Sequence, residues 1–88
     1  MTNTQKLKAV AELLGYDALS FISFDPRKNP AQLIEVEDLL LRRGWDLFWQ
    51  YGTSEYCWRK VPVGSATDAV RAIASINAAA EIAGGSGE

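Results

Sequence analysis

The sequence predicts one small α/β (α+β) domain in which helices pack on an antiparallel β-hairpin, in the order α-(β)-α-β-β-α. Three observations predict it. The chain has 88 residues, which is room for one domain. Apolar residues recur at helical spacing in three segments. Between the second and third of these, two aromatic-rich segments flank a turn. We assign residues 1–83 to the domain and expect the Gly- and Ser-rich residues 84–88 to form a flexible tail.

The first two helices are predicted from their ends as well as their apolar spacing. Residues 4–14 carry one apolar stripe, and Gly15 follows as a left-handed C-terminal residue. The second helix begins at an Asn29 cap with Pro30 in the first helical position. Its further end signals are Gln32 at the capping-box position and Gly44 after its last turn.

The hairpin is predicted from strands at residues 44–51 and 55–61, and its second strand ends at Pro62 and Gly64. We place Tyr51 opposite Tyr56. One face then carries Trp45, Leu47, Trp49, Tyr51, Tyr56 and Trp58, and the other carries Asp46, Phe48, Gln50, Cys57, Arg59 and Val61. A slip of one residue would exchange the faces of one strand.

The third helix is predicted from Ser65 to about Ala83, with Asp68 completing a capping box. Its apolar seam follows alternating spacings of three and four residues: Ala66, Ala69, Ile73, Ile76, Ala80 and Ala83. Its solvent stripe is Asp68, Arg71 and Ser75. Residues 16–28 have two interpretations, a short strand at 19–24 or an extended loop whose phenylalanines fill the core.

Composition excludes several classes of function. There are 9 basic and 11 acidic residues, so the net charge of −2 argues against binding of extended nucleic acid. Residues 27–60 hold six basic and five acidic residues, a local excess of only one positive charge. No apolar run is long enough to cross a membrane and no signal-peptide pattern opens the chain, so we expect a cytoplasmic protein.

Catalytic and metal-binding groups are scarce in this chain. There is no histidine, the commonest acid-base group and metal ligand, and Cys57 is the one cysteine. We interpret Cys57 as a packing residue, and the acidic Glu35, Glu37 and Asp38 as solvated residues near a helix start. The sequence therefore predicts no enzyme, no cofactor and no metal site.

The aromatic hairpin and its neighbouring arginines are the candidate binding site. Aromatic residues and arginine are enriched at binding hot spots. The candidate residues are Arg42, Arg43, Trp45, Trp49, Tyr51, Tyr56, Trp58 and Arg59. A two-stranded ribbon has two open edges and two faces to cover, so we also expect a homodimer or small homo-oligomer, with the sheet extended edge to edge or an open face covered.

Three segments resemble the phage ABA-sandwich domain family, a group of small bacteriophage proteins without an agreed activity. They are Arg42-Arg43-Gly44-Trp45, the aromatics around Tyr56-Cys57-Trp58, and the alanine-rich helix that follows. The resemblance covers roughly residues 29–80. It implies the fold and a phage or prophage origin, and no particular chemistry.

These observations lead to a ranked set of functions. The first is a non-enzymatic phage accessory protein that binds and inhibits a host factor in the host cytoplasm, for example a defence protein, by occlusion. The alternative is sequestration of a small nucleotide-like signalling ligand in an aromatic and arginine pocket. A virion structural or assembly role is third.

Overall fold

The computed structural model describes residues 2–17 and 23–84, and within them it confirms the predicted fold class. The described residues form three helices and a three-stranded antiparallel sheet with the strand order β1-β2-β3. The helices are α1 (Asn3–Leu13), α2 (Pro30–Arg42) and α3 (Arg71–Ala83). The strands are β1 (Asp46–Gln50), β2 (Glu55–Lys60) and β3 (Gly64–Asp68).

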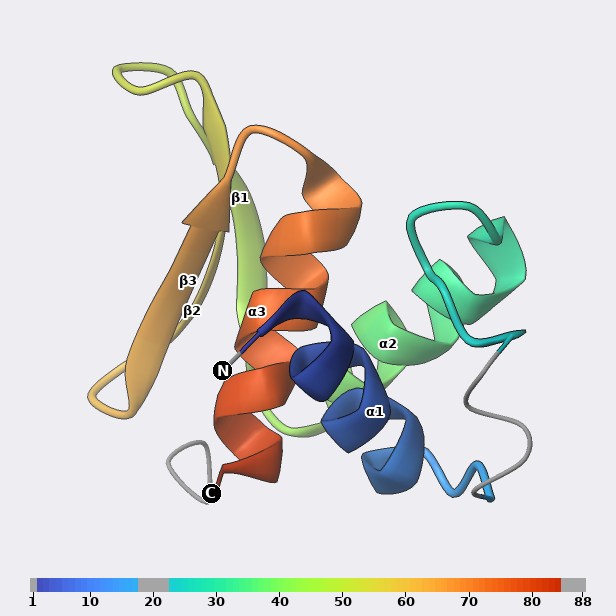
Figure 1. Cartoon of the computed structure of the whole chain (residues 1–88). Coiled ribbons are helices and arrows are strands. Elements are labelled where there is room, and N and C mark those ends of the chain that lie inside the picture. The colour runs from blue at the N-terminus through green and yellow to red at the C-terminus, as the bar shows by residue number, and fades with distance from the viewer. Residues whose placement is uncertain (1, 18–22, 85–88) are drawn as a thin grey trace.

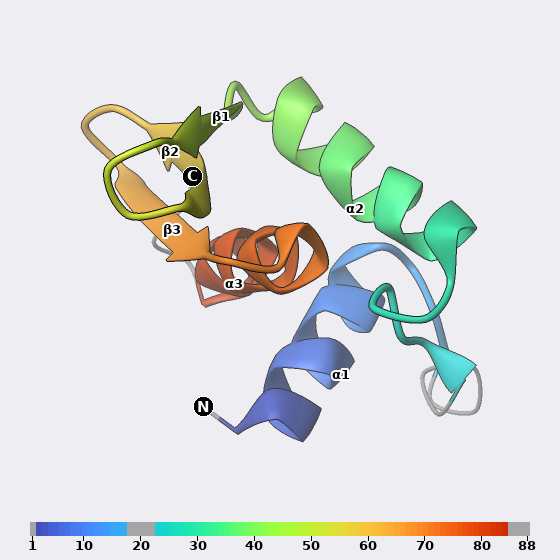
Figure 2. The same cartoon turned by 90° about the horizontal axis from the view of Figure 1, so that it is seen from above.

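The elements form layers with α3 in the middle (Figures 1 and 2). α3 packs on β2 and β3 on one side, and on α1 and α2 on the other. All three helices therefore lie on one face of the sheet, and none of them covers its outer face. We call the face toward α3 the inner face.

The ends of α1 follow local chemistry. Thr2 caps the helix, and Thr2 and Gln5 form a capping box in which each side chain accepts a hydrogen bond from the other residue's backbone N–H. The helix therefore begins one residue earlier than predicted. Gly15 has a φ of +92°, which confirms the predicted left-handed residue after this helix.

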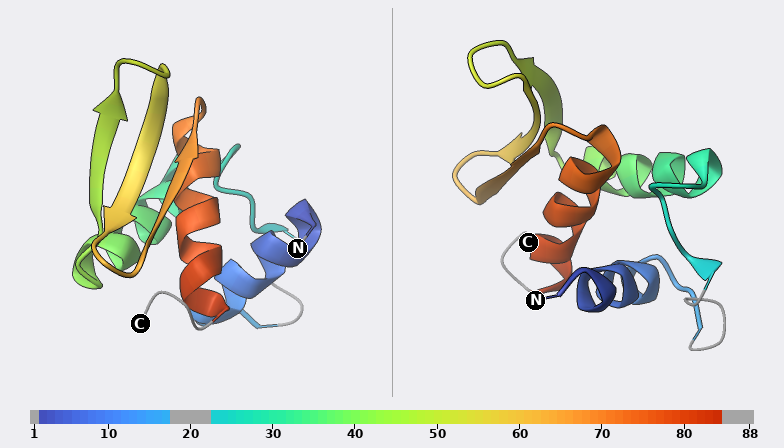
Figure 3. Two further views of the ribbon diagram at one scale, coloured as in Figure 1. Left: turned by 90° about the vertical axis from the view of Figure 1, so that its left-hand side faces the viewer. Right: turned by 45° about the horizontal axis from the view of Figure 1, so that its top comes forward.

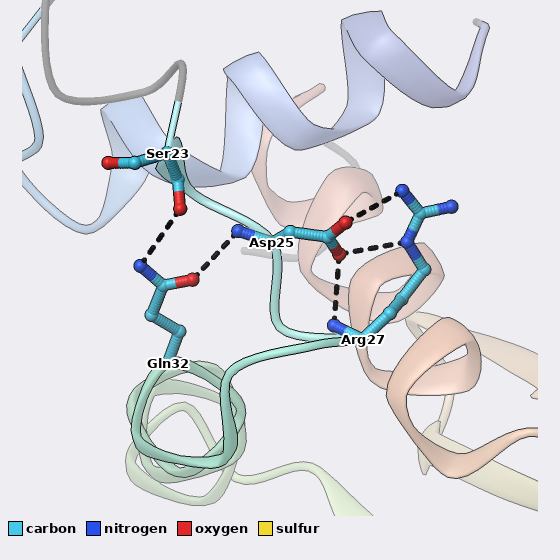
Figure 4. A network of polar contacts seen from close by, with 4 residues as sticks. All are labelled: Ser23, Asp25, Arg27 and Gln32. Carbon is cyan, nitrogen blue, oxygen red and sulfur yellow. Dashed lines mark hydrogen bonds and ion pairs between the residues drawn. The ribbon is translucent and has the colours of Figure 1, made fainter.

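The start of α2 is confirmed in part. The Asn29 side chain accepts hydrogen bonds from the backbone N–H groups of Ala31 and Gln32, as an N-cap should. The Gln32 side chain does not complete the predicted capping box. It is buried, and it accepts from the Asp25 N–H and donates to the Ser23 carbonyl (Figure 4).

The same loop holds an ion pair. Asp25 accepts two hydrogen bonds from the Arg27 guanidinium and one from the Arg27 backbone N–H (Figure 4). The guanidinium lowers the pKa of the Asp25 carboxyl group. Gln32 and this ion pair together fix the loop that leads into α2. The Gln32 side chain therefore bonds to the loop and not to the backbone of Asn29 at the start of the helix.

The hairpin is confirmed, but its register differs from the predicted one by two residues. Trp49 lies opposite Tyr56, and Leu47 lies opposite Trp58. Because side chains alternate with a period of two, a shift of two residues leaves every predicted face unchanged. Leu47, Trp49, Tyr56 and Trp58 share the inner face. Tyr51, predicted to be in the first strand, lies in the turn after β1.

The predicted start of the third helix was wrong. Residues 64–68 form β3, which pairs antiparallel with β2, and Trp58 lies opposite Ala66. Asp68 makes no capping box and instead accepts a hydrogen bond from the Val70 N–H. α3 begins at Arg71 with Val70 as a cap that supplies no side-chain hydrogen bond. Pairing with β2 outweighed the weak helix-start signal at Ser65.

The alanine content of α3 fits its central place. Eight of its residues are buried: Ala72, Ala74, Ser75, Ile76, Ala78, Ala79, Ala80 and Ile82. A helix with neighbours on two sides is apolar around most of its circumference, and small side chains let both layers approach closely. The prediction that Ser75 lies on a solvent stripe was wrong, because it is fully buried between layers.

Two predictions fall mainly outside the described residues. A strand at 19–24 overlaps residues 18–22, which the structure does not describe, and the described Ser23 and Phe24 are not in a strand. Phe24 is buried in the core beside Tyr16, as the loop interpretation expects for that residue. The predicted tail lies at residues 84–88, of which only Gly84 is described.

Candidate functional site

Three aromatic residues gather at the end of the β1–β2 hairpin, and we call them the aromatic cluster: Trp49, Tyr51 and Tyr56. The ring centroids of Trp49 and Tyr56 lie 4.7 Å apart at an interplanar angle of 71°, and those of Trp49 and Tyr51 lie 6.5 Å apart at 88°. Both pairs have the edge-to-face geometry that aromatic rings prefer. The hairpin end projects past the start of α3 (Figure 1). The rings are thus held against one another at an end of the sheet that α3 leaves uncovered.

Exposure differs strongly within the predicted set of aromatic residues. Tyr51 is 87 % exposed and Trp49 is 38 % exposed, whereas Tyr56 is partly buried. Trp45 and Trp58 are each 1 % exposed and belong to the hydrophobic core. Their assignment to a binding surface is therefore corrected. They fill the space between sheet and helices, as large rings do in a small domain.

Trp58 anchors a polar network that ties the sheet to two helices. Its indole Nε1 donates to Ser75 Oγ at 2.8 Å. The Ser75 hydroxyl has two acceptors within reach, the Arg71 carbonyl oxygen at 3.0 Å and Glu37 Oε2 at 3.3 Å. The Arg71 guanidinium donates twice to the Glu37 carboxylate, at 2.6 and 3.0 Å. The network links β2, α3 and α2.

This network lies near the aromatic cluster, because Arg71 follows three residues after Asp68, the partner of Tyr56 in the sheet. The hydrogen bonds to Glu37 raise the pKa of the Arg71 guanidinium, and the neighbouring Tyr56 makes a smaller contribution in the same direction. Val70, half exposed, precedes Arg71 at the same end of the sheet. We therefore extend the candidate site from the aromatic cluster to Val70 and the Arg71–Glu37 pair.

We predict that Ser75→Ala destabilises the fold, because it leaves the buried Trp58 N–H without its acceptor. The expected loss is about 1–3 kcal/mol of unfolding free energy, measured by urea denaturation. The matched variant is Trp58→Phe, which removes the donor. In the double variant, Ser75→Ala should cost clearly less than it does alone. Strict additivity of the two losses would contradict a shared hydrogen bond.

The predicted arginines do not surround the aromatic cluster within one chain. Arg42 is exposed at the end of α2 and pairs with Asp38 on its own helix, and the exposed Arg43 is the C-cap. Arg59 lies on the outer face of the sheet with its guanidinium 5.0 Å from the centroid of the Phe48 ring. Arg59 is paired with Asp46, whereas Tyr56 is paired with Trp49 three residues along each strand, so Arg59 lies about 10 Å along the strand from the nearest rings of the cluster at roughly 3.3 Å per residue.

Val70 and Arg71, with Glu37 as the ion-pair partner of Arg71, were not among the residues predicted from the sequence. Their place depends on β3, which turns the chain back toward the hairpin end before α3 starts. Recognising a strand at residues 64–68 would have placed Val70 and Arg71 at this end of the sheet. The weak strand propensity of its glycine, alanine and aspartate hid that strand.

Cys57 shows no sign of nucleophilic activation. Its side chain lies on the outer face between Phe48 and Thr67 on the flanking strands and is 2 % exposed. Burial raises the pKa of the Cys57 thiol, which keeps it protonated at neutral pH. This supports its interpretation as a packing residue.

Three surface cavities lie away from the aromatic cluster. The first, of about 50 Å³, lies between α1, α3 and Arg27; the second lies along α1; and the third lies at the turn between β2 and β3. None of the three is lined by an aromatic ring. Among residues 2–17 and 23–84, no three His, Cys, Asp or Glu residues are grouped so that they could hold a metal ion. No helix in these ranges has the length and apolar character to cross a bilayer.

Comparison with known proteins adds no assignment. No protein-family model matches this chain, and neither a curated protein nor a solved structure does. The resemblance to the phage ABA-sandwich family therefore stays a hypothesis that rests on the three segments named above.

Proposed function

We propose that this protein is a non-enzymatic accessory protein that binds a host factor through the aromatic cluster and inhibits it by occlusion. The observation that carries the proposal is the exposure of Tyr51 and Trp49 on a rigid, ring-packed hairpin end. Tyr and Trp supply large contact areas and dominate binding hot spots. The phage origin implied by the sequence resemblance supports a host protein as the partner.

The cluster is suited to binding because it is already ordered. Trp49 contacts both tyrosines, so its ring has little rotamer freedom left to lose on association. Val70, two residues after the Tyr56 partner Asp68, adds exposed apolar area at this end of the sheet, and Arg71, paired with Glu37, follows it with a charge. An apolar centre with a polar rim is the usual layout of a protein interface.

The three surface cavities described above favour occlusion over capture of a small ligand. Capture of a nucleotide-like ligand requires rings and an arginine to converge on one pocket. The cavity at the β2–β3 turn is lined by Arg59 and Lys60 and by no ring. A broad exposed patch, in contrast, needs no cavity.

The test uses Tyr51→Ala, since Tyr51 is the most exposed large hydrophobic side chain among the described residues. Immobilised wild-type protein is incubated with bacterial host lysate, and the retained proteins are quantified by mass spectrometry. The expected result is a host protein that wild type retains and Tyr51→Ala loses at least tenfold. The control is Ile34→Ala, which removes another exposed apolar side chain, 67 % exposed, from α2 and should retain the same protein.

Two results would overturn the proposal. One is equal retention by wild type and Tyr51→Ala of every protein enriched over a blank resin. The other is a small-molecule adduct of a few hundred daltons in native mass spectra of gently purified protein, lost in Tyr51→Ala. That result would establish ligand sequestration instead.

A further inference from the structure

β1 is a free edge of the sheet. Among residues 2–17 and 23–84, only β2 pairs with it, and α3 packs on β2 and β3. Figure 3 (left) shows β1 at the margin of the sheet with no described segment running along its outer side. In an antiparallel sheet, alternate residues of an edge strand point their N–H and C=O groups away from the neighbour. β1 therefore presents a row of backbone groups with which no other described strand pairs.

The central part of β1 has none of the features that discourage pairing with another strand. Natural proteins protect edge strands with proline, charged side chains, bulges or a covering helix. β1 is regular and contains no proline, its one charged residue is Asp46 at its first position, and its three central residues are Leu47, Phe48 and Trp49. The other edge strand, β3, consists of small and polar residues and has α3 packed on it. β1 is therefore the edge that favours association.

The residues of β1 are compatible with a second copy of themselves. An antiparallel pairing centred on Phe48 is the register that pairs all five residues. It places Leu47 opposite the partner's Trp49, and Asp46 opposite the partner's Gln50, so no like charges meet. Because every pair then joins residues of the same face, the two sheets continue as one with all helices on one side.

We infer that two copies of this chain pair through β1, with Phe48 on the twofold axis, and form a continuous six-stranded sheet. The pairing satisfies roughly four to six backbone hydrogen bonds. On the outer face, the two Phe48 rings meet, each with its own Arg59 guanidinium over it. On the inner face, Leu47 of each copy packs beside the partner's Trp49.

The dimer also completes the candidate site. In an antiparallel pair, the start of one β1 lies beside the end of the other. The end of α2, with the exposed Leu41, Arg42 and Arg43, joins the start of β1 through Gly44 and Trp45. The partner's Tyr51 follows the end of its own β1. Arg42 and Arg43 lie away from the aromatic cluster of their own chain. In the dimer they lie at the end of the paired strands where the partner's cluster lies.

The test uses the fact that Phe48 of one copy would lie opposite Phe48 of the other. Sedimentation velocity of wild type over a concentration series should show a dimer. Phe48→Lys and Phe48→Glu should each be folded by circular dichroism and monomeric, because each sets like charges against each other on the axis. An equimolar mixture of the two variants should form a dimer, because Lys and Glu then face each other. Its dissociation constant should be at least tenfold lower than that of either variant alone.

Matched controls are Thr67→Lys and Thr67→Glu. Like Phe48, Thr67 lies on the outer face of an edge strand, but its strand is β3 and its side chain is the more exposed of the two. Both variants should dimerise as wild type does. Three results would overturn the inference: a monomeric wild type at every concentration, no dimer in the Phe48 mixture, or dissociation caused by the Thr67 variants.

This inference and the proposed function fail separately. Tyr51 lies outside β1, so Tyr51→Ala should leave the dimer intact. Both the sedimentation and the host-protein retention of this variant are therefore measured. A host protein retained through Tyr51 by a monomeric chain would remove the dimer and keep the function. A dimer that retains no host protein through Tyr51 would keep the dimer inference and overturn the proposed function.

Discussion

Trp58→Ala is expected to destabilise the protein by about 3–5 kcal/mol, the usual cost of truncating a fully buried aromatic side chain. Trp58 is 1 % exposed, lies on the central strand and donates to Ser75. The variant loses ring contacts with the core and leaves Ser75 without its donor. Since a domain of this size has about 5–15 kcal/mol of total stability, the variant should be largely unfolded at modest urea concentrations, as measured by far-UV circular dichroism.

The matched control for this prediction is Trp49→Ala on the neighbouring strand. It makes the same chemical change on the same face of the sheet, but Trp49 is 38 % exposed and its main loss is ring contact with two tyrosines. We expect roughly 1–2 kcal/mol, mostly from those aromatic pairs. Equal losses for the two variants would contradict the assignment of Trp58 to the core and Trp49 to the surface.

Ala78→Leu is expected to cost about 1–3 kcal/mol by overpacking. Ala78 is fully buried on α3, which has the sheet on one side and two helices on the other. Extra methyl groups there must push apart layers that small side chains hold close. The measurement is the shift in the urea midpoint at constant slope, which reports a change in stability and not in compactness.

Ala83→Leu is the control on the same helix, because Ala83 is exposed and leucine and alanine both favour helices. It should leave the urea midpoint nearly unchanged. If Ala78→Leu were equally neutral, the space around α3 would be looser than the alanine pattern indicates.

The ends of the helices could be predicted because their chemistry is local. Asn29 and Pro30 start α2, and Gly15 adopts the positive φ that its position after α1 requires. Each of these choices involves atoms within four residues, so the sequence alone contains the necessary information. Gln32 is the instructive exception. Its side chain could close a local capping box, but the loop at Ser23 and Asp25 offers buried partners that only the fold brings close.

The faces of the hairpin could also be predicted, although its register could not. Alternation assigns Trp58 and Trp49 to one face in any register that differs by an even number of residues. Which of these rings is covered depends on where α3 lies, and alternation carries no such information. Alternation therefore places the tryptophans and tyrosines of the hairpin together, and the structure divides them into the buried Trp45 and Trp58 and the more exposed aromatic cluster.

The sequence by itself determined the fold class, the Asn29 cap of α2, the strands β1 and β2 and the faces of their residues, because these depend on neighbours along the chain. Only the tertiary structure decided that residues 64–68 pair with β2, that Ser75 is buried, and that Arg71 lies near the aromatic cluster. The physical reason is common to all three. A short segment such as Ser65 to Asp68 has nearly balanced helix and strand preferences, and long-range pairing and burial then decide its structure.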